Sequence, residues 1–536
     1  MGSSSTYDPE YSASMLFFAT IAAVALSAIW LSHYVSRCAF KISRWPPGPR
    51  SLPVIGHLHL INELAHQSFA KLSETYGPIM GIRLGSKPSI IISSPGLAKE
   101  LLQTNDRTFA NRPRIAAAVH MFSSSSSMSF TSYGPWFKLA RQICASELFT
   151  PRRLSSFREM REEQSGQMLQ AVFQIGHGGN QKVEPRTILF TAASNMICMM
   201  MMGKLSAEVS ADVPGYDFGT LKLQTLADEL ISLVSVFCVG DYIPWLSWLD
   251  PNGYIKRMKA VGRKFRALFQ AIVDERRRRS RGANLSVDTT EDFLDILLAA
   301  AEEHKQDAII SDENVTALLL DLFLASTSTT SIAIEWTLAE LLSNPKSMVK
   351  LTEEIDTVVG KTRFLTEKDI ENLPYLQMVV KESLRLHPPG ALLLPHESME
   401  DCKIGGYDIP SNTMAYVNVW AIGRDPSIWE TPQMFLPERF EGKNVTVYGR
   451  HFDLLPFGSG RRMCPGWSLA MADLHLLIGT FVQAYSLSVN SGNQSDVLDG
   501  ATIDFSEKAG SSISMRTPLA VFARPRLPLH MYQPSS

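Results

Sequence analysis

The chain has 536 residues, and 45% of them are hydrophobic, which is enough to bury a deep core. Its formal net charge of -2 gives no reason to expect a nucleic-acid partner, and nothing after Pro46 has the composition of a long linker, so we expect one large domain. The cysteines lack the spacing of disulfide frameworks or zinc sites, which suits a reducing compartment. They are Cys38, Cys144, Cys198, Cys238, Cys402 and Cys464.

The first predicted element is a membrane span. Residues Met15–Leu31 carry no charge, and with its flanks this run reaches about 20 residues, the length that crosses a bilayer. Asp8 and Glu10 lie before the run and basic residues follow it, so the bulk of the chain should lie on the cytosolic side. A cleaved signal peptide would need a basic leading segment and a small-residue cleavage site, and the charge order here is the reverse.

A proline-rich arm follows the predicted span. The prolines of Trp45–Arg50 (WPPGPR) cannot continue a helix and stiffen the chain into an extended connection. We therefore divide the chain into a luminal tail (1–12), a transmembrane anchor (13–35), a basic and proline-rich hinge (36–50) and one large domain (51–536).

The large domain is predicted to be mostly helical with small sheets. Alternating apolar residues predict strands at Ile79–Gly85 and Pro88–Ser93, and the serine run Ser123–Ser127 is expected to be a loop. A long amphipathic helix ends in Arg276–Arg279, where cations suit the helix dipole; docking to an anionic partner is the alternative. An exposed loop (RGANLSVDTTED) and a long apolar helix (ALLLDLFLASTSTTSIAIEWTLAELLS) follow.

Near the C-terminus, one cysteine lies in a setting that suits metal ligation. The segment Phe457–Gly466 (FGSGRRMCPG) places Cys464 after a glycine-containing loop and directly before a helix-compatible run. Backbone N–H groups and the positive end of a helix favour a thiolate there. Gly458 and Gly460 allow the backbone to approach a flat macrocycle, and Arg462 offers a fork for a carboxylate. A buried, inert cysteine is the alternative reading.

This segment resembles the haem-binding signature of cytochromes P-450, FxxGxRxCxG. The matching positions are Phe457, Gly460, Arg462, Cys464 and Gly466. Segments such as VGDYIPWLSWLD and LPYLQMVVKESLRLHPP resemble the plant microsomal A-type group of that family. The resemblance covers nearly the whole chain. It implies the cytochrome P-450 fold, which is mainly α with small β-sheets (α+β), behind an N-terminal transmembrane helix.

The resemblance also implies the cofactor and its contacts. Cys464 would be the axial ligand of haem b, iron protoporphyrin IX, so that residues 51–536 would form a haem-thiolate catalytic domain. The family's Trp-x-x-x-Arg pair is shifted here by one residue: either the tryptophan still reaches a propionate, or that contact is lost and Phe137 only packs. The residues expected to bind the cofactor are Trp136, Arg141, His396, Phe457 and Arg462.

A structural triad is implied beneath the haem. Glu382 and Arg385 (KESLR) lie on one helical face, and Arg439 follows in a proline-bounded loop (FLPERF). In the family the matching residues form a buried salt-bridged group. Because such groups contribute little net stability, its expected role is to fix the loop that carries the cysteine.

The long apolar helix would cross the distal face of the haem. Its family pattern is A/G-G-x-D/E-T-T/S, and Ala325–Thr330 reads ASTSTT. Thr329 matches the family's alcohol and, with Ser328, is the predicted catalytic pair for proton delivery. Ser326 replaces the usual glycine and Ser328 the usual acid, and a serine can pass a proton but cannot store a charge. This leaves hydroxylation with a water-assisted relay, poorly coupled turnover, or chemistry that needs less proton delivery. These hydroxyls could also bond a carbonyl of their own helix and bend it.

The segments that would face the substrate are placed by analogy with the family. Their residues are mostly small and apolar, which implies a lipophilic substrate, although each residue could instead be plain core. The candidates are Ala116, Val119, Leu322, Ala325, Ala391, Leu392 and Gly510.

We therefore expect a single-pass endoplasmic reticulum membrane monooxygenase that hydroxylates a lipophilic plant secondary metabolite: a phenylpropanoid or flavonoid, a terpenoid or an alkaloid. Electrons would come from NADPH–cytochrome reductase, because the chain has no nucleotide-binding glycine fingerprint; cytochrome b5 and membrane lipid are further expected partners. One alternative is a haem-thiolate isomerase, dehydratase or oxidative-coupling enzyme. The missing acid favours it slightly, while intact Thr329 weighs against it. Another alternative is a non-catalytic haem-binding protein.

Overall fold

The computed structural model describes residues 44–206, 220–282, 292–304, 309–490 and 503–533, together with Thr20 and Ser27. The predicted tail and anchor, apart from those two residues, lie outside the described residues, and so does most of the loop predicted after the basic cluster.

The described α-helices are α2 (Ala65–Tyr76), α3 (Pro95–Lys99), α4 (Ala116–Met121), α5 (Pro135–Ile143), α6 (Pro151–Ser156), α7 (Arg158–Ile175), α8 (Pro185–Met202), α10 (Thr220–Val234), α11 (Val239–Tyr242), α12 (Tyr254–Gly282), α13 (Phe293–Glu303), α14 (Asp312–Ser343), α15 (Pro345–Val358), α16 (Pro374–Leu386), α17 (Val419–Ile422) and α18 (Trp467–Ala484). The strands are β1 (Ile79–Leu84), β2 (Lys87–Ile92), β3 (Lys182–Val183), β4 (His396–Glu397), β5 (Cys402–Ile404), β6 (Tyr407–Ile409), β7 (Met414–Val417), β8 (Tyr485–Ser488), β9 (Glu507–Lys508), β10 (Ser514–Met515) and β11 (Val521–Pro525).

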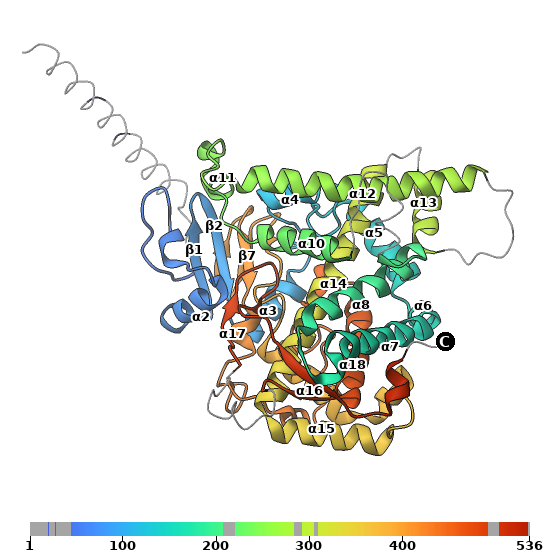
Figure 1. Cartoon of the computed structure of the whole chain (residues 1–536). Helices are drawn as coiled ribbons and strands as arrows, with labels where there is room; N and C mark the ends of the chain where they lie inside the picture. Colours follow the sequence, from blue (N-terminus) through green and yellow to red (C-terminus); the bar gives the residue numbers. More distant parts are fainter. Residues whose placement is uncertain are drawn as a thin grey trace, which may run out of the picture.

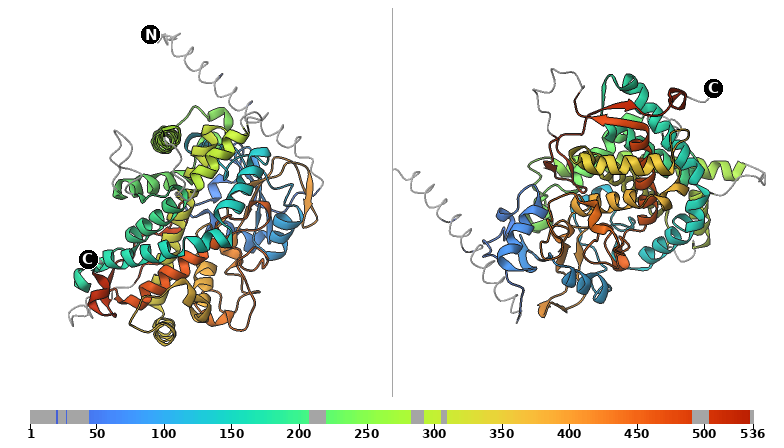
Figure 2. Two further views of the ribbon diagram at one scale, coloured as in Figure 1. Left: turned by 90° about the vertical axis from the view of Figure 1, so that its right-hand side faces the viewer. Right: turned by 90° about the horizontal axis from the view of Figure 1, so that it is seen from below.

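A small mixed sheet lies at one side of a large helical body (Figure 1). Its strand order is β1-β2-β7-β4, in which only the β2–β7 pair is parallel. A second sheet, β3-β11-β8, and two hairpins complete the β-structure of the described residues. The right-hand view in Figure 2, seen from below, shows the same separation, with the blue N-terminal region at one side of the helices. The mainly helical fold with small sheets predicted from the sequence is confirmed.

Helix α14 runs through the centre of the helical body, and both large hydrophobic clusters pack around it. Ser311 and Asn314 close its N-terminus with a capping box, in which each side chain bonds the other residue's backbone N–H. Most of its residues are buried, on all sides of the helix, as expected for a helix in the core of a large domain. It is therefore held in place from every direction and can support a site on one face.

By length and hydropathy alone, two described stretches could span a membrane, Leu223–Tyr242 and Asp312–Ser343. The second is the central helix α14. Its most apolar window is 83% buried, so the protein core accounts for its composition.

The two strands predicted near the N-terminus form β1 and β2, and the amphipathic helix with its basic end forms α12. The basic cluster is paired with the chain's own carboxylates: Arg276 contacts Asp292 and Asp295, each at 2.7 Å, and Arg277 contacts Asp312 at 2.6 Å. This pairing favours the structural interpretation of the cluster over docking to an anionic partner.

The proline-rich arm packs closely on β1. Gly81 donates its N–H to the carbonyl of Pro47 at 2.8 Å, and a Cβ on Gly81 would lie 2.2 Å from the indole nitrogen of Trp45. The segment from Trp45 onward therefore already packs against the large domain, before the boundary predicted at residue 51. The division of the chain into tail, anchor, hinge and domain stays a prediction.

Candidate functional site

The backbone conformation of the loop that carries Cys464 is restricted by close contacts with its neighbours. The backbone N–H of Cys464 donates to the carbonyl of Phe457 at 2.9 Å. Gly458 and Gly460 both have φ of +69°, the left-handed region that favours glycine. A Cβ on Gly460 would lie 2.0 Å from the carbonyl oxygen of Leu102, so no other residue fits there without moving backbone.

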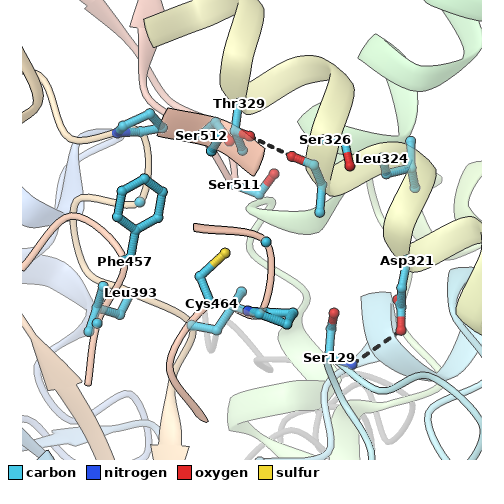
Figure 3. Close-up of a pocket in the computed structure, with 18 of the residues that line it drawn as sticks. Ser129, Asp321, Leu324, Ser326, Thr329, Leu393, Phe457, Cys464, Ser511 and Ser512 are labelled. Atoms are coloured by element: carbon cyan, nitrogen blue, oxygen red, sulfur yellow. Dashed lines mark hydrogen bonds between the residues drawn. The ribbon is translucent and has the colours of Figure 1, made fainter. Parts of the chain in front are cut away.

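Cys464 lies just before α18, and its sulfur points into a cavity (Figure 3). Burial raises the pKa of the Cys464 thiol, while the backbone N–H of Gly466 and the charge of Arg141 act in the opposite direction. The predicted contributions to thiolate stability are therefore present, but burial outweighs them in the protein alone. A metal cation at the sulfur would supply the missing charge.

The cavity in front of Cys464 has a volume of about 350 Å³. Helix α14 borders it opposite the cysteine, and Figure 3 shows Thr329 and Ser326 on that side and Phe457 and Leu393 beside the cysteine. Its wall is mostly apolar. Such a pocket suits a flat or compact lipophilic group with a few polar contacts.

Three guanidinium groups border the cavity: that of Arg112, which is buried, and those of Arg141 and Arg462, which are half-buried. Among the described residues their hydrogen bonds go only to backbone carbonyls, those of Ser129, Leu394 and Pro395 for Arg112, of Met463 for Arg141, and of Ala110, Met128 and Thr131 for Arg462. Each guanidinium has five N–H donors, so donors remain for an anion.

The positive charges of these arginines repel one another. Burial lowers the pKa of Arg462 to about 10, with Arg141 acting in the same direction, and burial together with Arg462 lowers the pKa of Arg112. A cationic cluster without a carboxylate partner in the described chain fits a ligand that brings two carboxylates. The residues present therefore fit a haem, whose sulfur ligand and propionate partners would lie at one cavity. Arg112 was not predicted from the sequence, where it is one arginine among many.

His396 also lines the cavity, but its ring is set up differently from the prediction. Its Nδ1 lies 2.8 Å from the carbonyl of Phe109, so Nδ1 carries the proton and donates it. Burial, and then Arg112, lower the pKa of His396 to about 3. In this neutral tautomer Nε2 is an acceptor. It would bind a propionate only if the anion itself caused the ring to protonate.

Trp136 does not border the cavity among the described lining residues, which argues against the predicted propionate contact. Its indole N–H donates to the carbonyl of Ser126 at 2.7 Å, which uses its one polar group. Phe137 lies toward the cavity instead, with the Arg462 guanidinium carbon 3.8 Å from its ring centroid. Of the two readings left open by the shifted motif, the geometry favours the one in which Phe137 packs.

The hydroxyls of α14 bond mainly to their own helix. Thr329 donates to the carbonyl of Ala325, and Ser326 donates to that of Leu322 at 2.6 Å. Both are contacts one helical turn back, the alternative role considered for these residues. Ser328 is buried at the cavity, and its hydroxyl has no hydrogen-bond partner within the described part of the chain. It is therefore available to a ligand or a water.

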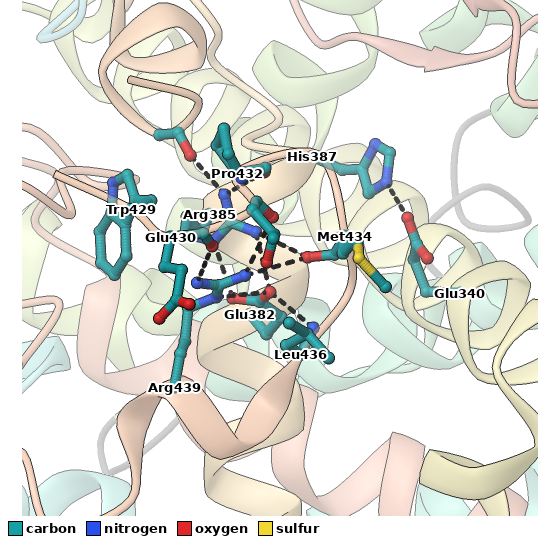
Figure 4. A network of polar contacts seen from close by, with 12 residues as sticks. Glu340, Glu382, Arg385, His387, Trp429, Glu430, Pro432, Met434, Leu436 and Arg439 are labelled. Atoms are coloured by element: carbon teal, nitrogen blue, oxygen red, sulfur yellow. Dashed lines mark hydrogen bonds and ion pairs between the residues drawn. The ribbon is translucent and has the colours of Figure 1, made fainter. Parts of the chain in front are cut away.

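Glu382, Arg385 and Arg439 meet in one network (Figure 4). The carboxylate of Glu382 accepts from Arg385 Nε at 2.8 Å and from Arg439 Nε at 2.9 Å, and also from the backbone N–H of Leu436 at 2.8 Å. Arg385 in turn donates to the carbonyls of Pro432 and Met434. A buried charged group thus joins helix α16 to residues 432–439, the loop that precedes the cysteine segment.

Two of the predicted substrate residues, Leu322 and Ala325, line the cavity. Within the described lining the cavity is bordered by close neighbours of the other five: Phe122 instead of Ala116 and Val119, Leu393 and Leu394 instead of Ala391 and Leu392, and Ser511 and Ser512 instead of Gly510. Helix α4, which carries Ala116 and Val119, packs toward α12. Leu392 packs with the core beneath the sheet.

The cytochrome P450 family profile matches residues 46–508. The (+)-menthofuran synthase of Mentha piperita is 36% identical over 96% of this chain and 99% of its own length. The flavonoid 3',5'-hydroxylase of Campanula medium is 36% identical over 97% and 99%. A solved zebrafish cytochrome P450 with progesterone superposes with a TM-score of 0.70 at 26% identity, covering 86% of this chain and 99% of that one.

Members of this family hold a haem through a cysteine thiolate and receive electrons from a redox partner. The position of Cys464 at the cavity matches the first of these features. The chain belongs to the cytochrome P450 family of monooxygenases.

Proposed function

We propose that this chain hydroxylates a lipophilic plant secondary metabolite, of the phenylpropanoid or flavonoid, terpenoid or alkaloid class, with dioxygen and electrons from NADPH. The single observation that carries the proposal is the sulfur of Cys464 pointing into a mostly apolar cavity opposite the hydroxyl-bearing face of α14. The names of the plant relatives, a menthofuran synthase and a flavonoid hydroxylase, support the substrate class.

We propose that this cavity binds haem b, and that Cys464 would supply the thiolate that holds its iron. A thiolate-ligated haem supplies oxygen activation by favouring O–O cleavage. Arg112, Arg141 and Arg462 would hold its propionates, because they are cationic, at least half-buried and without carboxylate partners in the described chain. Phe457 lies beside the cysteine (Figure 3) and would pack against the ring. Glu382, Arg385 and Arg439 would act at a distance by holding the loop before the cysteine.

Ser328 and Thr329 would manage protons at the distal face. The Thr329 hydroxyl donates to its own helix, so its lone pairs are free to accept while the donor is engaged. Ser328 has a free donor and a free acceptor within the described part of the chain, but no charge to store. This arrangement supports a relay that includes water, the first of the three readings of the serine substitutions.

We propose that the protein works at the endoplasmic reticulum membrane with NADPH–cytochrome reductase, and with cytochrome b5 and lipid as further partners. Beside the sheet region, Trp245 is 67% and Trp248 is 76% exposed, and Phe237 and Leu249 are exposed nearby in the chain. Exposed tryptophans are typical of segments at a membrane–water interface. This patch supports membrane contact in addition to the predicted anchor.

The test is turnover of a panel of flavonoids, monoterpenoids and alkaloids by the full-length protein reconstituted with lipid and NADPH–cytochrome reductase. We expect a product that carries one oxygen atom from isotopically labelled dioxygen and that forms only with NADPH and reductase. A product that forms without either would favour the isomerase or dehydratase alternative, for which the missing acid at Ser328 is the supporting observation.

A further inference from the structure

Asp321 is a buried carboxylate in an apolar helix, and the proposed chemistry does not use it. It lies on α14 two turns before Thr329, borders the cavity and is only 4% exposed. Burial raises its pKa to about 7, against hydrogen bonds from Ser127, Ser129 and Met128 that lower it. A carboxylate in such a place needs partners, and the identity of those partners indicates its role.

The partners of Asp321 all belong to residues Ser126–Thr131, which we call the serine loop. The hydroxyl of Ser127 lies 2.9 and 3.0 Å from the two carboxylate oxygens, and the backbone N–H of Ser129 donates at 3.2 Å (Figure 3). With the further bonds from Met128 and the Ser129 side chain, the acceptor positions of the carboxylate are largely filled.

The opposite side of the serine loop faces the cationic cluster. The carbonyl of Ser129 accepts from Arg112 at 3.2 Å, and the carbonyls of Met128 and Thr131 accept from Arg462 at 3.1 and 2.5 Å. Trp136 adds its indole N–H to the carbonyl of Ser126. The hydroxyl of Ser127 and the N–H of Ser129 therefore point to α14. The carbonyls of Met128, Ser129 and Thr131 point to the two arginines that we assign to the propionates.

We propose that Asp321 is a positioning residue: it fixes the serine loop from α14 and, through the loop carbonyls, sets the orientation of Arg112 and Arg462. The inference rests on the proposed function for the identity of the anion that these arginines hold. The contact between Asp321 and the loop is independent of the proposed function. The role differs from direct binding of a cationic substrate, which would require free acceptors on the carboxylate.

The first measurement is hydrogen exchange of the serine loop in the full-length protein. Asp321→Ala removes every acceptor, so the amides of Ser126–Thr131 should exchange about 5- to 30-fold faster. Asp321→Asn keeps one oxygen and should lie between this variant and the wild type. Asp241→Ala is the control, because Asp241 is a half-buried aspartate whose carboxylate accepts from the backbone N–H of Ala116 at 2.7 Å. It should change exchange near Ala116 and leave the serine loop unchanged.

The second measurement is the rate at which haem leaves the protein for apomyoglobin. Asp321→Ala should raise that rate by about 2- to 30-fold with the thiolate-type CO spectrum retained, and Asp241→Ala should not. If the exchange of the loop rises but the rate of haem loss does not, the loop does not orient the arginines and the proposal is wrong. Loss of the CO spectrum in the wild type would instead overturn the proposed cofactor and leave the exchange result standing.

Direct substrate recognition by Asp321 gives a different pattern. The benzyltrimethylammonium ion and its neutral isostere, neopentylbenzene, would then differ in affinity for the wild type but not for Asp321→Asn, and the serine loop would exchange at the wild-type rate in that variant. This pattern would contradict the positioning role. We expect instead that the difference in affinity between the two probes is the same for the wild type and for Asp321→Asn.

Discussion

The loop that carries Cys464 and the turn of α14 that carries Thr329 face each other across one cavity, but they are fixed in different ways. The cysteine loop is held by close backbone approach at Gly460 and follows a segment that a buried ion network joins to α16. The α14 turn is held by helical packing, and its hydroxyls bond within their own helix. The cysteine loop therefore tolerates almost no change in its backbone. The α14 turn, in contrast, can carry different polar side chains while its helical backbone stays the same. This difference explains how a common cofactor site can carry different distal chemistry.

The largest effect should come from breaking the cysteine loop. Gly460→Ala places a methyl group 2.0 Å from the carbonyl oxygen of Leu102 in a left-handed conformation. We expect a destabilisation of more than about 4 kcal/mol, measured by chemical unfolding, with little or no haem incorporated. Gly406→Ala is a suitable control, because Gly406 also has positive φ but a Cβ at that position would meet no described atom within 4 Å. Equal losses in both variants would show that backbone strain alone, and not the close approach, accounts for the effect.

The ion network should give the next largest effect. Glu382→Gln leaves Arg385 and Arg439 buried without their shared carboxylate, which should cost about 3–5 kcal/mol in unfolding free energy. Lys350→Ala removes a surface pair with Glu438 and should leave the unfolding free energy nearly unchanged. A loss below about 1 kcal/mol in Glu382→Gln would contradict the proposed role of this network in fixing the loop.

On the α14 side, stability should depend on pH through Asp321. Its pKa is about 7 in the folded protein, against an ordinary value of 3.8, so the folded state retains a proton that the unfolded state loses between these pH values. Stability from this group therefore falls as pH rises from about 4 to 7, by up to about 1.4 kcal/mol per pH unit, and then levels off. Asp321→Asn should flatten this part of the curve in urea unfolding experiments. An unchanged slope would mean that the carboxylate is not protonated in the fold.

The smallest effect should come from the polar groups opposite the cysteine. Ser328→Asp restores an acid next to Thr329 and should raise the ratio of product to hydrogen peroxide by about tenfold or less, without loss of the haem spectrum. Ser328→Ala, which removes the hydroxyl alone, is the control and should lower that ratio. A lower ratio or a different product in Ser328→Asp would show that the serine is specialised for another chemistry.

The sequence predicted the parts of the site that depend on local geometry. A cysteine before a helix and the order of the charged motifs can be recognised in one segment at a time. Gly458 and Gly460 were predicted to let the backbone approach a macrocycle; both have positive φ, and the close approach at Gly460 is to the carbonyl of Leu102. The predictions failed where the outcome depends on which side of a segment faces the cavity. Phe122, Leu393 and Ser512 line it rather than the predicted residues a few positions away. Periodicity does not fix that orientation in short helices and loops.

Contacts between polar residues far apart in the sequence were also not predicted. Arg112 meets the cavity only because its guanidinium bonds the carbonyls of Leu394 and Pro395, about 280 residues further along the chain. Trp136 was tied to the cofactor by its motif, yet its single N–H is used by Ser126. Asp321, by contrast, had a visible signal: it is an acid with apolar residues on both sides (ALLLDLFLA), and such a residue requires buried partners.

The most direct test of the central claim is the absorbance spectrum of the reduced CO complex, recorded for the wild type and for Cys464→Ala in the same membranes. The wild type should show the band of a thiolate-ligated haem, and Cys464→Ala should lose it completely, while Cys144→Ala, which changes a buried cysteine on the neighbouring segment, should retain it. A thiolate-type band that persists in Cys464→Ala would contradict the assignment of this cysteine as the ligand.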